Sequence, residues 1–497
     1  MEGQRSQGAK LISPGAEVVP FDRPLTPGEE RKNTEGLANP SGVWNQSLMY
    51  SITLKSILND VQPIKGFVYE SVNYSTAMFG TIEVVVVPRR GSQPRCSGCG
   101  RAGPTYDHAA QPRVWILPPL FKFALVLLYT MRRVKCPTCG VLVEKVPWVT
   151  GKHSLCDGFR LLLARWARKL SWDETADSFH VSWADVYASV QWVVEHGLRH
   201  RKLENIQAIG IDEICVRVGR VFWTLIYQID EHLTRLLWVG HDRSEPTLLR
   251  GLNRLGTEVC AGIRYVCSDM WAPYLAAVKS RLSALHVLDR FHIRQQLNKA
   301  IDEIRRDEAR ALAQAGLVPR LKKLRWALLK NRRNWTASER RRMGELEHSG
   351  LAAIRAFWLV AAFEHFWGYV SPTWAGKFLD GWCQRVRRSR LKPLKTVATS
   401  LTEHREILLN YFRAKKAISG GVIEGLNNKV KVTFRKSYGF RTDKAREIAL
   451  FHVLGDLPEP QLAHGFFQRT TFSKPYPFGG DGFCTWSSGR RLWPSKA

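Results

Sequence analysis

The sequence predicts a multidomain α/β protein in which a mixed β-sheet is interrupted by a long all-helical segment. Three observations indicate this fold class. Strand-like apolar runs cluster between Ile206 and Asp289, helical and basic patterns occupy residues 293–416, and an amphipathic helical pattern follows from Gly421. The chain has 497 residues, enough for two or more domains that each bury their own core.

The net charge indicates the class of partner. Lys and Arg number 74 against 44 Asp and Glu, which gives a formal charge of +30. Such a charge attracts polyanions and releases the counterions of their phosphates. Nucleic acid is therefore the favoured partner, although a ribosomal-type protein or a membrane-surface protein would have a similar composition.

The sequence shows no signal for membrane insertion or export. No apolar run reaches the roughly 20 residues that cross a bilayer, and the stretch "MEGQRSQGAK" lacks the apolar segment of a signal peptide. We therefore expect a soluble, cytoplasmic protein with reduced cysteines.

The N-terminal part predicts a tail followed by a zinc-binding domain. Residues 1–46 are rich in Gly, Pro, Ser and charge without periodicity, which predicts a disordered tail. In residues 47–150 the strand-like run "TIEVVVVPRR" precedes two CxxC pairs, and we expect a β/zinc-binding domain there.

The two CxxC pairs predict a structural Zn²⁺ site. They supply Cys96, Cys99, Cys136 and Cys139, and each pair is followed by glycine. Four thiolates so spaced can hold one Zn²⁺ tetrahedrally, whereas disulfides are disfavoured inside a cell. The long gap between the pairs predicts a strand or two within it. The other cysteines are expected to be buried apolar residues: Cys156, Cys215, Cys260, Cys267, Cys383 and Cys484.

Residues 151–203 predict a helix-turn-helix DNA-binding domain. Ser171 and Ser182 stand at helix N-cap positions, and acidic residues follow each of them in the next turn. Helix, short turn and helix would offer the last helix to a DNA major groove. A plain three-helix packing unit would give the same pattern. Trp183 and Tyr187 could contact DNA or belong to the core.

Two acids follow strand-like runs in residues 204–292. Asp212 ends "AIGID" and Asp269 ends "IRYVCSD", and a buried carboxylate is costly unless it is paired or binds metal. Each alone could be a cap or a salt-bridge partner. The order β-β-β-α-β-α, however, is typical of ribonuclease H-like folds, which gather acids on adjacent strands. Two Mg²⁺ ions between such acids can activate a nucleophile and stabilise the leaving oxygen of a phosphodiester.

A third metal ligand is predicted in residues 417–457, the second part of this core. In "GVIEGLNNKVKVTFRKSYGFR" one face of the helix combines a single acid with polar and basic residues, and another face is apolar. The first face contains Glu424, Asn428, Lys431 and Arg435, and the second contains Ile423, Leu426, Val430 and Phe434. Glu424 would then face the metals while the basic residues meet phosphates. A surface helix with one incidental acid is the alternative.

The remaining segments complete the predicted organisation. Residues 293–416 are too many for a minimal core and are expected to form an all-α insertion domain, whose basic stretches could line the DNA path. Residues 458–497 are expected to be a C-terminal tail.

The motifs "IGIDE", "SDMWAPY", "HVLDRFH" and "GVIEGLNNKVKVTFRKSYGFR" together resemble those of bacterial DDE transposases of the ISL3 insertion-sequence family, across about residues 51–467. The resemblance implies that Asp212, Asp269 and Glu424 bind Mg²⁺ or Mn²⁺. It also implies that Asp289 and His292 form an Asp-x-x-His element beside the active site, although Asp289 could be a strand-end acid with a local hydrogen bond.

The resemblance also implies an activity and its partners. The protein would bind the terminal inverted repeats of its own element, cleave them and join them to target DNA, as a homodimer or larger assembly near the nucleoid. Further DNA contacts are expected from Lys436 and Arg441. Two alternatives remain from the sequence: a non-catalytic DNA-binding regulator, and a metal-dependent, structure-specific nuclease that never joins strands.

Overall fold

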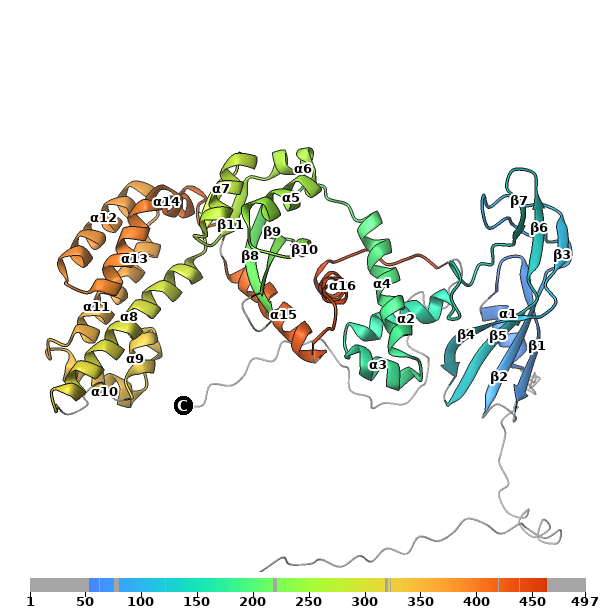
Figure 1. Ribbon diagram of the computed structural model, residues 1–497, viewed down its shortest axis with the longest axis horizontal. Helices are drawn as coiled ribbons and strands as arrows, with labels where there is room; N and C mark the ends of the chain where they lie inside the picture. The colour runs from blue at the N-terminus through green and yellow to red at the C-terminus, as the bar shows by residue number, and fades with distance from the viewer. Residues whose placement is uncertain are drawn as a thin grey trace, which may run out of the picture. The chain divides into compact units, whose positions relative to one another are not determined.

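The computed structural model describes residues 53–462, except residues 62, 76–79, 121, 218–220, 318–320, 322, 419 and 438 (Figure 1). The predicted tail over residues 1–46 lies outside the described residues, and so does the predicted C-terminal tail over residues 458–497 from residue 463 onward, with Cys484.

Two small sheets follow helix α1 (Leu54–Val61). The first has the strand order β1-β2-β5-β4 and the second the order β3-β6-β7. Trp148 packs edge-on against Trp115 and Tyr129 at ring-centroid distances of 5.4 Å each, in the core of the first sheet. The strands are β1 (Phe67–Ser75), β2 (Thr81–Pro88), β3 (Thr105–His108), β4 (Arg113–Leu120), β5 (Phe123–Tyr129), β6 (Arg132–Cys136) and β7 (Gly140–Val143).

The predicted strand in "TIEVVVVPRR" is confirmed as β2, but the prediction of a strand or two between the CxxC pairs was too low. Among the described residues three strands, β3 to β5, lie wholly between Cys99 and Cys136, and a fourth, β6, ends at Cys136. The reason is that the two sheets interleave in sequence. The pair β4 and β5 returns to the first sheet, with β5 parallel to β2, whereas β3 and β6 belong to the second.

Three helices follow: α2 (Asp157–Ala167), α3 (Trp172–Phe179) and α4 (Trp183–His200). The predicted N-caps are confirmed. Ser171 and Ser182 each accept a hydrogen bond from the backbone N–H three residues later, and Glu174 and Asp185 close reciprocal capping boxes. Between α3 and α4 the chain turns at His180, whose φ is 53°.

A five-stranded sheet with the order β10-β9-β8-β11-β12 begins at Ala208. The first three strands are antiparallel, and β11 is parallel to both β8 and β12. The strands are β8 (Ala208–Arg217), β9 (Val221–Asp230), β10 (Leu233–Gly240), β11 (Tyr265–Ser268) and β12 (Leu285–Leu288), and the connecting helices are α5 (Glu245–Leu255), α6 (Thr257–Gly262) and α7 (Ala272–Arg281).

Both faces of this sheet are covered by helices, which explains its near-continuous apolar strands. Ile209 and Ile211 of β8 pack on one face with residues of α5 and α7. Ala208, two residues before Gly210, packs on the other face with α4, α15 (Gly421–Lys436) and α16 (Asp443–Leu454). Side chains alternate along a strand, so Asp212 points to the face that carries α15.

Between β12 and α15 every element formed by the described residues is helical, and these helices share a core of their own. Trp335 and Trp382 are buried in it, whereas Trp326 and Trp374 are 62% and 60% exposed. The elements are α8 (Arg290–Gln314), α9 (Arg325–Leu329), η1 (Arg332–Asn334), α10 (Ala337–Leu346), α11 (Ala352–Phe363), η2 (Glu364–Gly368), α12 (Pro372–Arg388), α13 (Lys392–Glu403) and α14 (Arg405–Arg413).

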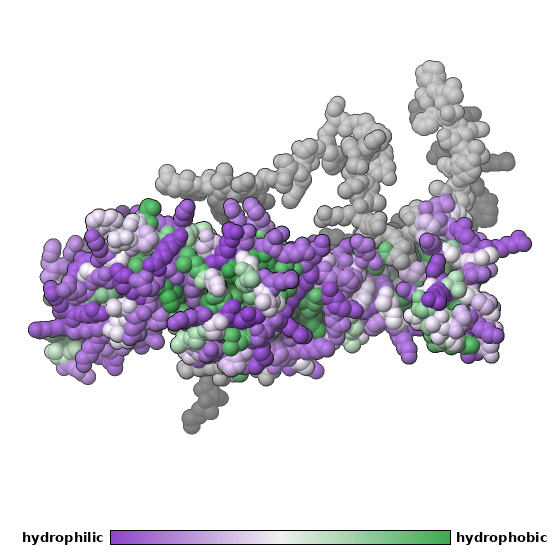
Figure 2. Space-filling view, turned by 90° about the horizontal axis from the view of Figure 1, so that it is seen from above, coloured by the Kyte–Doolittle hydropathy of each residue, from purple (hydrophilic) through white to green (hydrophobic). Residues whose placement is uncertain are grey.

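The surface is mainly hydrophilic on the face drawn in Figure 2, as the composition predicts. No helix within the described ranges is both long and apolar enough to cross a bilayer. Four of the scattered cysteines are buried as expected: Cys156, Cys260, Cys267 and Cys383. Cys215 is exposed, against expectation, because it lies where β8 continues beyond its pairing with β11.

Candidate functional site

Three acids gather at one edge of the five-stranded sheet. Asp269 directly follows β11 and Asp289 directly follows β12. Asp212 does not end its strand as predicted but lies inside β8, two residues beyond Gly210, where the pairing with β11 stops. Because β8, β11 and β12 are parallel, their carboxyl ends lie at the same edge.

Asp212 is buried and held by hydrogen bonds from two directions. Its Oδ2 accepts a hydrogen bond from the side-chain amide of Asn427 in α15, and its Oδ1 accepts one from the backbone N–H of Glu213 at 2.8 Å. Tyr227 of β9 in turn donates its hydroxyl to Asn427 Oδ1 at 2.8 Å. The carboxylate orientation is therefore fixed by a chain of buried polar groups.

Asp289 lies at the N-termini of two helices. It caps α8, accepting a hydrogen bond from the backbone N–H of Phe291 at 2.8 Å. It also abuts the first turn of α15, because a Cβ added to the N-cap residue Gly420 would lie 1.8 Å from Asp289 Oδ1. Only glycine permits this approach, and the positive ends of both helix dipoles favour the carboxylate.

His292 stands among these carboxylates. Its Nε2 is 3.7 Å from Asp212 Oδ1 and 3.9 Å from Asp289 Oδ2. Burial lowers the pKa of His292, but the nearby carboxylate of Asp212 and the charges of Asp289 and Asp269 outweigh burial and raise the pKa to about 9. An imidazole that charges so readily indicates that the cluster attracts cations.

Asp269 is the acid whose ionisation is most opposed. Burial raises its pKa to about 6, although its carboxylate accepts a hydrogen bond from the backbone N–H of Trp271 at 3.1 Å. The charges of Asp212 and Glu213 add to the effect. A cation bound at this edge would favour the ionised form of the whole cluster.

Glu424 reaches the cluster from α15. Its charge raises the pKa of Asp289, after burial as the main cause, so the two carboxylates are close enough to interact. The predicted faces of this helix are confirmed. Glu424, Asn428, Lys431 and Arg435 are exposed, Ile423, Leu426 and Val430 are buried, and Phe434 is half-buried.

The other predicted DNA contacts differ in their surroundings. Trp183 is 40% exposed and stacks on Tyr187, which is half-buried, with ring centroids 5.4 Å apart. Arg441 is exposed. The ammonium of Lys436, by contrast, donates to the carbonyls of Ala167 and Arg168 at 3.2 and 3.1 Å, so it binds the end of α2 within the fold.

Sequence reasoning missed Asn427. The signal available was its position, because Asn427 lies on the apolar stripe of α15, between Leu426 and Val430. A polar residue on a buried stripe needs a buried partner. The partner itself, Asp212, is 215 residues away and was not deducible from the pattern.

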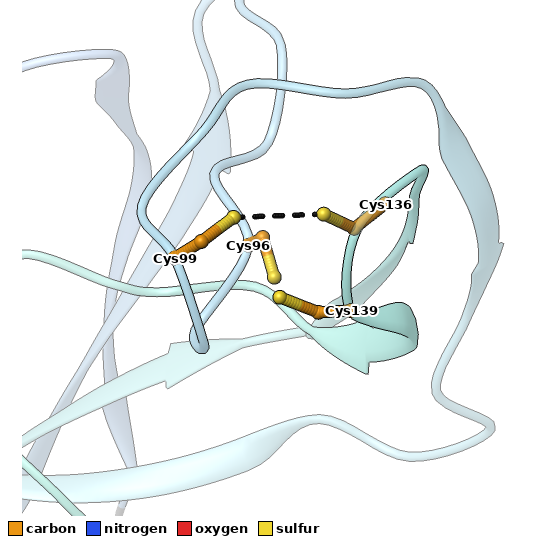
Figure 3. Close-up of side chains that lie close together, drawn as sticks. All are labelled: Cys96, Cys99, Cys136 and Cys139. Carbon is orange, nitrogen blue, oxygen red and sulfur yellow. Dashed lines mark hydrogen bonds between the residues drawn. The ribbon is translucent and has the colours of Figure 1, made fainter.

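The four predicted zinc ligands lie together (Figure 3). The Sγ atoms of Cys96, Cys99, Cys136 and Cys139 are all within 4.8 Å of one another. Backbone N–H groups of Thr138 and Cys139 lower the pKa of Cys136 to about 7, whereas the contact with Cys99 raises the pKa of Cys139 to about 12, so a bound cation would be needed for all four sulfurs to be thiolates. The glycines after each pair, Gly100 and Gly140, have φ of +74° and +76°, a conformation that glycine adopts without strain. The donor set and its compactness fit a structural Zn²⁺.

The acidic cluster is less compact than the cysteine cluster. Among the described residues, the four cysteines form the one group of possible metal ligands (His, Cys, Asp or Glu) whose ligand atoms all lie within 4.8 Å of one another. The acids supply only oxygen atoms, the donors that Mg²⁺ and Mn²⁺ prefer. Their charge and donor chemistry fit a divalent cation.

Comparison with known proteins identifies the family. The family model of the ISL3 transposases, described as "Transposase", matches residues 209–447, and a second model, described as the "zinc-finger of transposase IS204/IS1001/IS1096/IS1165", matches residues 92–139.

Two relatives agree with this assignment. The chain is 24% identical over 381 residues to the transposase for insertion sequence element IS1001 of Bordetella parapertussis, covering 76% of this chain and 92% of that protein. It is 28% identical over 404 residues to the transposase for insertion sequence element IS1557 of Mycobacterium tuberculosis, covering 75% and 88%. The chain belongs to the ISL3 family of insertion-sequence transposases.

Proposed function

We propose that this transposase cleaves the ends of its insertion sequence and joins them to target DNA by a metal-dependent DDE reaction. The observation that carries the proposal is the convergence of Asp212, Asp269 and Asp289 at one sheet edge, with Glu424 presented by a helix that hydrogen-bonds to Asp212 through Asn427. The mixed sheet would be a ribonuclease H-like core, and the helices α8 to α14 its all-α insertion.

Asp212, Asp269 and Glu424 would hold Mg²⁺ or Mn²⁺. When bound, a pair of such ions activates the attacking oxygen and stabilises the leaving oxygen of a phosphodiester. Asn427 and Tyr227 fix the rotamer of Asp212. Asp289 and His292 would support the ligands, since His292 adds a positive charge next to Asp212.

The DNA would be bound by several elements. We propose that α3 and α4 act as a helix-turn-helix on the terminal inverted repeats, together with the zinc-bearing domain, and that Lys431 and Arg435 contact phosphates. A cavity of about 850 Å³ in the helical segment offers a further basic surface. Its cationic lining consists of Arg294, Lys330, Arg332, Arg333 and Arg340.

The reaction joins two element ends to one target, so we propose a homodimer or a larger assembly that works at the nucleoid in the cytoplasm. Two ends held by two copies would be cut in one complex. Analytical ultracentrifugation with and without end DNA measures this assembly.

The deciding experiment incubates the protein with DNA that contains the element ends, in Mg²⁺ or Mn²⁺. Wild-type protein should give cleaved and joined products, Asp212→Asn and Glu424→Gln should abolish both, and end binding should be nearly unchanged in each variant. Glu258→Gln, which removes an exposed acid of α6 away from the cluster, is the matched control and should cut normally.

Three results would contradict the proposal. Normal cleavage by Glu424→Gln would remove Glu424 from the metal ligands. Cleavage without joining by the wild-type protein would indicate a nuclease. Binding without cleavage would indicate a regulator.

A further inference from the structure

Arg243 is a cation held beside the acidic cluster. Its guanidinium Nη1 lies 3.3 and 3.5 Å from the two carboxylate oxygens of Glu213, the residue that follows Asp212. Its side chain is 40% exposed. A positive charge disfavours the binding of a metal cation nearby. The presence of Arg243 beside the proposed metal ligands therefore needs a functional explanation.

We propose that Arg243 binds a backbone phosphate of the DNA within one nucleotide of the bond that is cleaved. The inference rests on the proposed function, since it assumes that the acidic cluster receives DNA. The ligand group is the anionic oxygen pair of a phosphodiester, which matches the planar, forked donors of a guanidinium.

The loop that carries Arg243 is fixed to the sheet. It connects β10 to α5, and the buried hydroxyl of Thr224 in β9 donates to the carbonyl of Asp242 at 2.6 Å. Thr224 also shares a 2.7 Å hydrogen bond with the hydroxyl of Tyr274 in α7. On the other side, Ser244 donates its backbone N–H and its hydroxyl to the Asp242 carboxylate at 2.8 and 2.6 Å. The backbone of Arg243 is therefore held before any ligand binds.

The side chain is held by two aromatic rings. The guanidinium carbon lies 4.5 Å from the ring centroid of Phe222 and 4.5 Å from that of Trp271. Trp271 also donates its indole N–H to the carbonyl of Arg243 at 3.0 Å. Because the backbone N–H of Trp271 donates to Asp269, one residue positions both the cation and a proposed metal ligand.

The ion pair with Glu213 engages only one of the guanidinium nitrogens of Arg243. A guanidinium has five N–H groups, and within the described part of the chain Glu213 is the carboxylate that forms an ion pair with Arg243, through a single nitrogen. The contact is long for a charge-assisted hydrogen bond. An arginine that only neutralised Glu213 would need neither two aromatic rings nor an exposed guanidinium. An arginine that binds a phosphate beside the acids would use the rings to hold its side chain and the exposed N–H groups to contact the phosphate.

The test removes charge from one phosphate at a time. End DNA is made with a single methylphosphonate at each position around the cleaved bond, and cleavage and binding are measured for wild type, Arg243→Gln and Arg243→Lys. Loss of a charge-assisted contact should lower cleavage of unmodified DNA by Arg243→Gln about 10- to 100-fold. Arg243→Lys should recover part of that loss.

The expected signature is non-additivity at one position. For wild type, one methylphosphonate within a nucleotide of the cleaved bond should be as harmful as Arg243→Gln. On that same DNA the variant should lose little more, because both changes remove the same contact. Trp271→Phe should weaken the response at this position only, since the ring remains but the indole N–H is lost.

The control is Arg254→Gln, which removes an exposed arginine at the end of α5 and should keep the wild-type pattern. If Arg243→Gln keeps the full wild-type sensitivity at every methylphosphonate, Arg243 does not touch the backbone and only pairs with Glu213. Binding measured by anisotropy gives the same scan without cleavage. A wild-type protein that binds but never cuts would therefore refute the proposed function while the Arg243 contact is still decided.

Discussion

At the scale of single residues, Asn427 connects two strands of the sheet to helix α15. Its amide joins Asp212 of β8 to Tyr227 of β9 and belongs to a helix that arrives more than 200 residues later. Asn427→Ala should lower the free energy of unfolding by about 1–3 kcal/mol, because a buried carboxylate and a buried hydroxyl lose their partner.

The same variant should slow DNA cleavage more than it weakens DNA binding, because the Asp212 carboxylate would no longer have one orientation. Thermal melting and a cleavage assay measure the two effects. Asn428→Ala, the exposed neighbour, serves as the stability control. Equal melting temperatures for the two variants would contradict the role given to Asn427.

Gly420 and Gly425 form a second matched pair on α15. Gly420→Ala places a methyl group against the carboxylate of Asp289 and should cost about 1–3 kcal/mol of stability. Gly425→Ala meets nothing within 4 Å and should stabilise the helix by about 0.5–1 kcal/mol. Denaturant unfolding of both variants measures the difference. A tolerated Gly420→Ala would show that α15 starts farther from β12.

The sequence allows some residues of the candidate site to be identified, but not others. Asp212, Asp269 and Glu424 were identifiable because an acid after an apolar run, or alone on a basic helix face, conflicts with its neighbours. Asn427, Glu213 and Arg243 were not, because each acquires its role from a contact between segments that are distant in sequence. A local pattern contains no information about those contacts.

At the scale of elements, the sheet β3-β6-β7 has very little apolar core. The cluster around it contains Cys96, Val134 and Cys136, with Cys139 and Leu142 half-buried beside it. A core of this size cannot offset the entropy of ordering three strands, so the metal must contribute the stability.

Removal of zinc tests this. A chelator, or Cys136→Ser, should expose the segments of about residues 92–110 and 131–145 to proteolysis, while β4 and β5 of the first sheet and α8 to α16 stay protected. Limited proteolysis with mass spectrometry identifies the cut sites, and adding Zn²⁺ back should restore protection in the wild type only. Uniform resistance without zinc would contradict a structural metal.

Helix α16 contains a histidine that should make folding sensitive to acid. Burial, followed by the charges of Arg168 and Lys436, lowers the pKa of His452 to about 3. Lys429 and Asp456 line the small cavity next to it. In the unfolded chain the pKa is about 6.5, so between these values the unfolded state binds more protons and stability falls as the pH falls.

The slope from His452 alone is about 1.4 kcal/mol per pH unit between roughly pH 6 and pH 4. His452→Leu should flatten the dependence of the unfolding free energy on pH between 6 and 4, which denaturant titrations at several pH values measure. An unchanged slope would show that His452 is already protonated in the fold.

The boundaries and faces of helices were predictable where side chains close together in sequence determine them. The capping boxes at Ser171 and Ser182 and the two faces of α15 follow from side chains within one or two turns. The number of strands between the CxxC pairs was not predictable, because the pairing of β5 with β2 joins segments on either side of the first pair.

At the scale of the whole molecule, the charge of +30 gives a prediction about salt. Lys431→Gln and Arg435→Gln should each reduce the slope of log affinity against log salt by about 0.9, the value for one phosphate contact. Lys436→Gln is the control, because its ammonium binds carbonyls of α2. It should change stability and leave the slope unaltered, which anisotropy titrations at several salt concentrations can measure.

The position of α15 in the chain has a consequence for synthesis. A ribosome that has just passed β12 has made Asp212, Asp269 and Asp289, but Glu424 and the amide that orients Asp212 are still about 135 residues away. Chains fold from the N-terminus as they emerge. The zinc-bearing segment, whose small core includes no residue of α15, can therefore fold before the acidic cluster is complete, whereas helices α2 to α4 share their core with α15 and α16 and must wait for both. A chain whose translation stops early lacks the groups proposed to cut DNA.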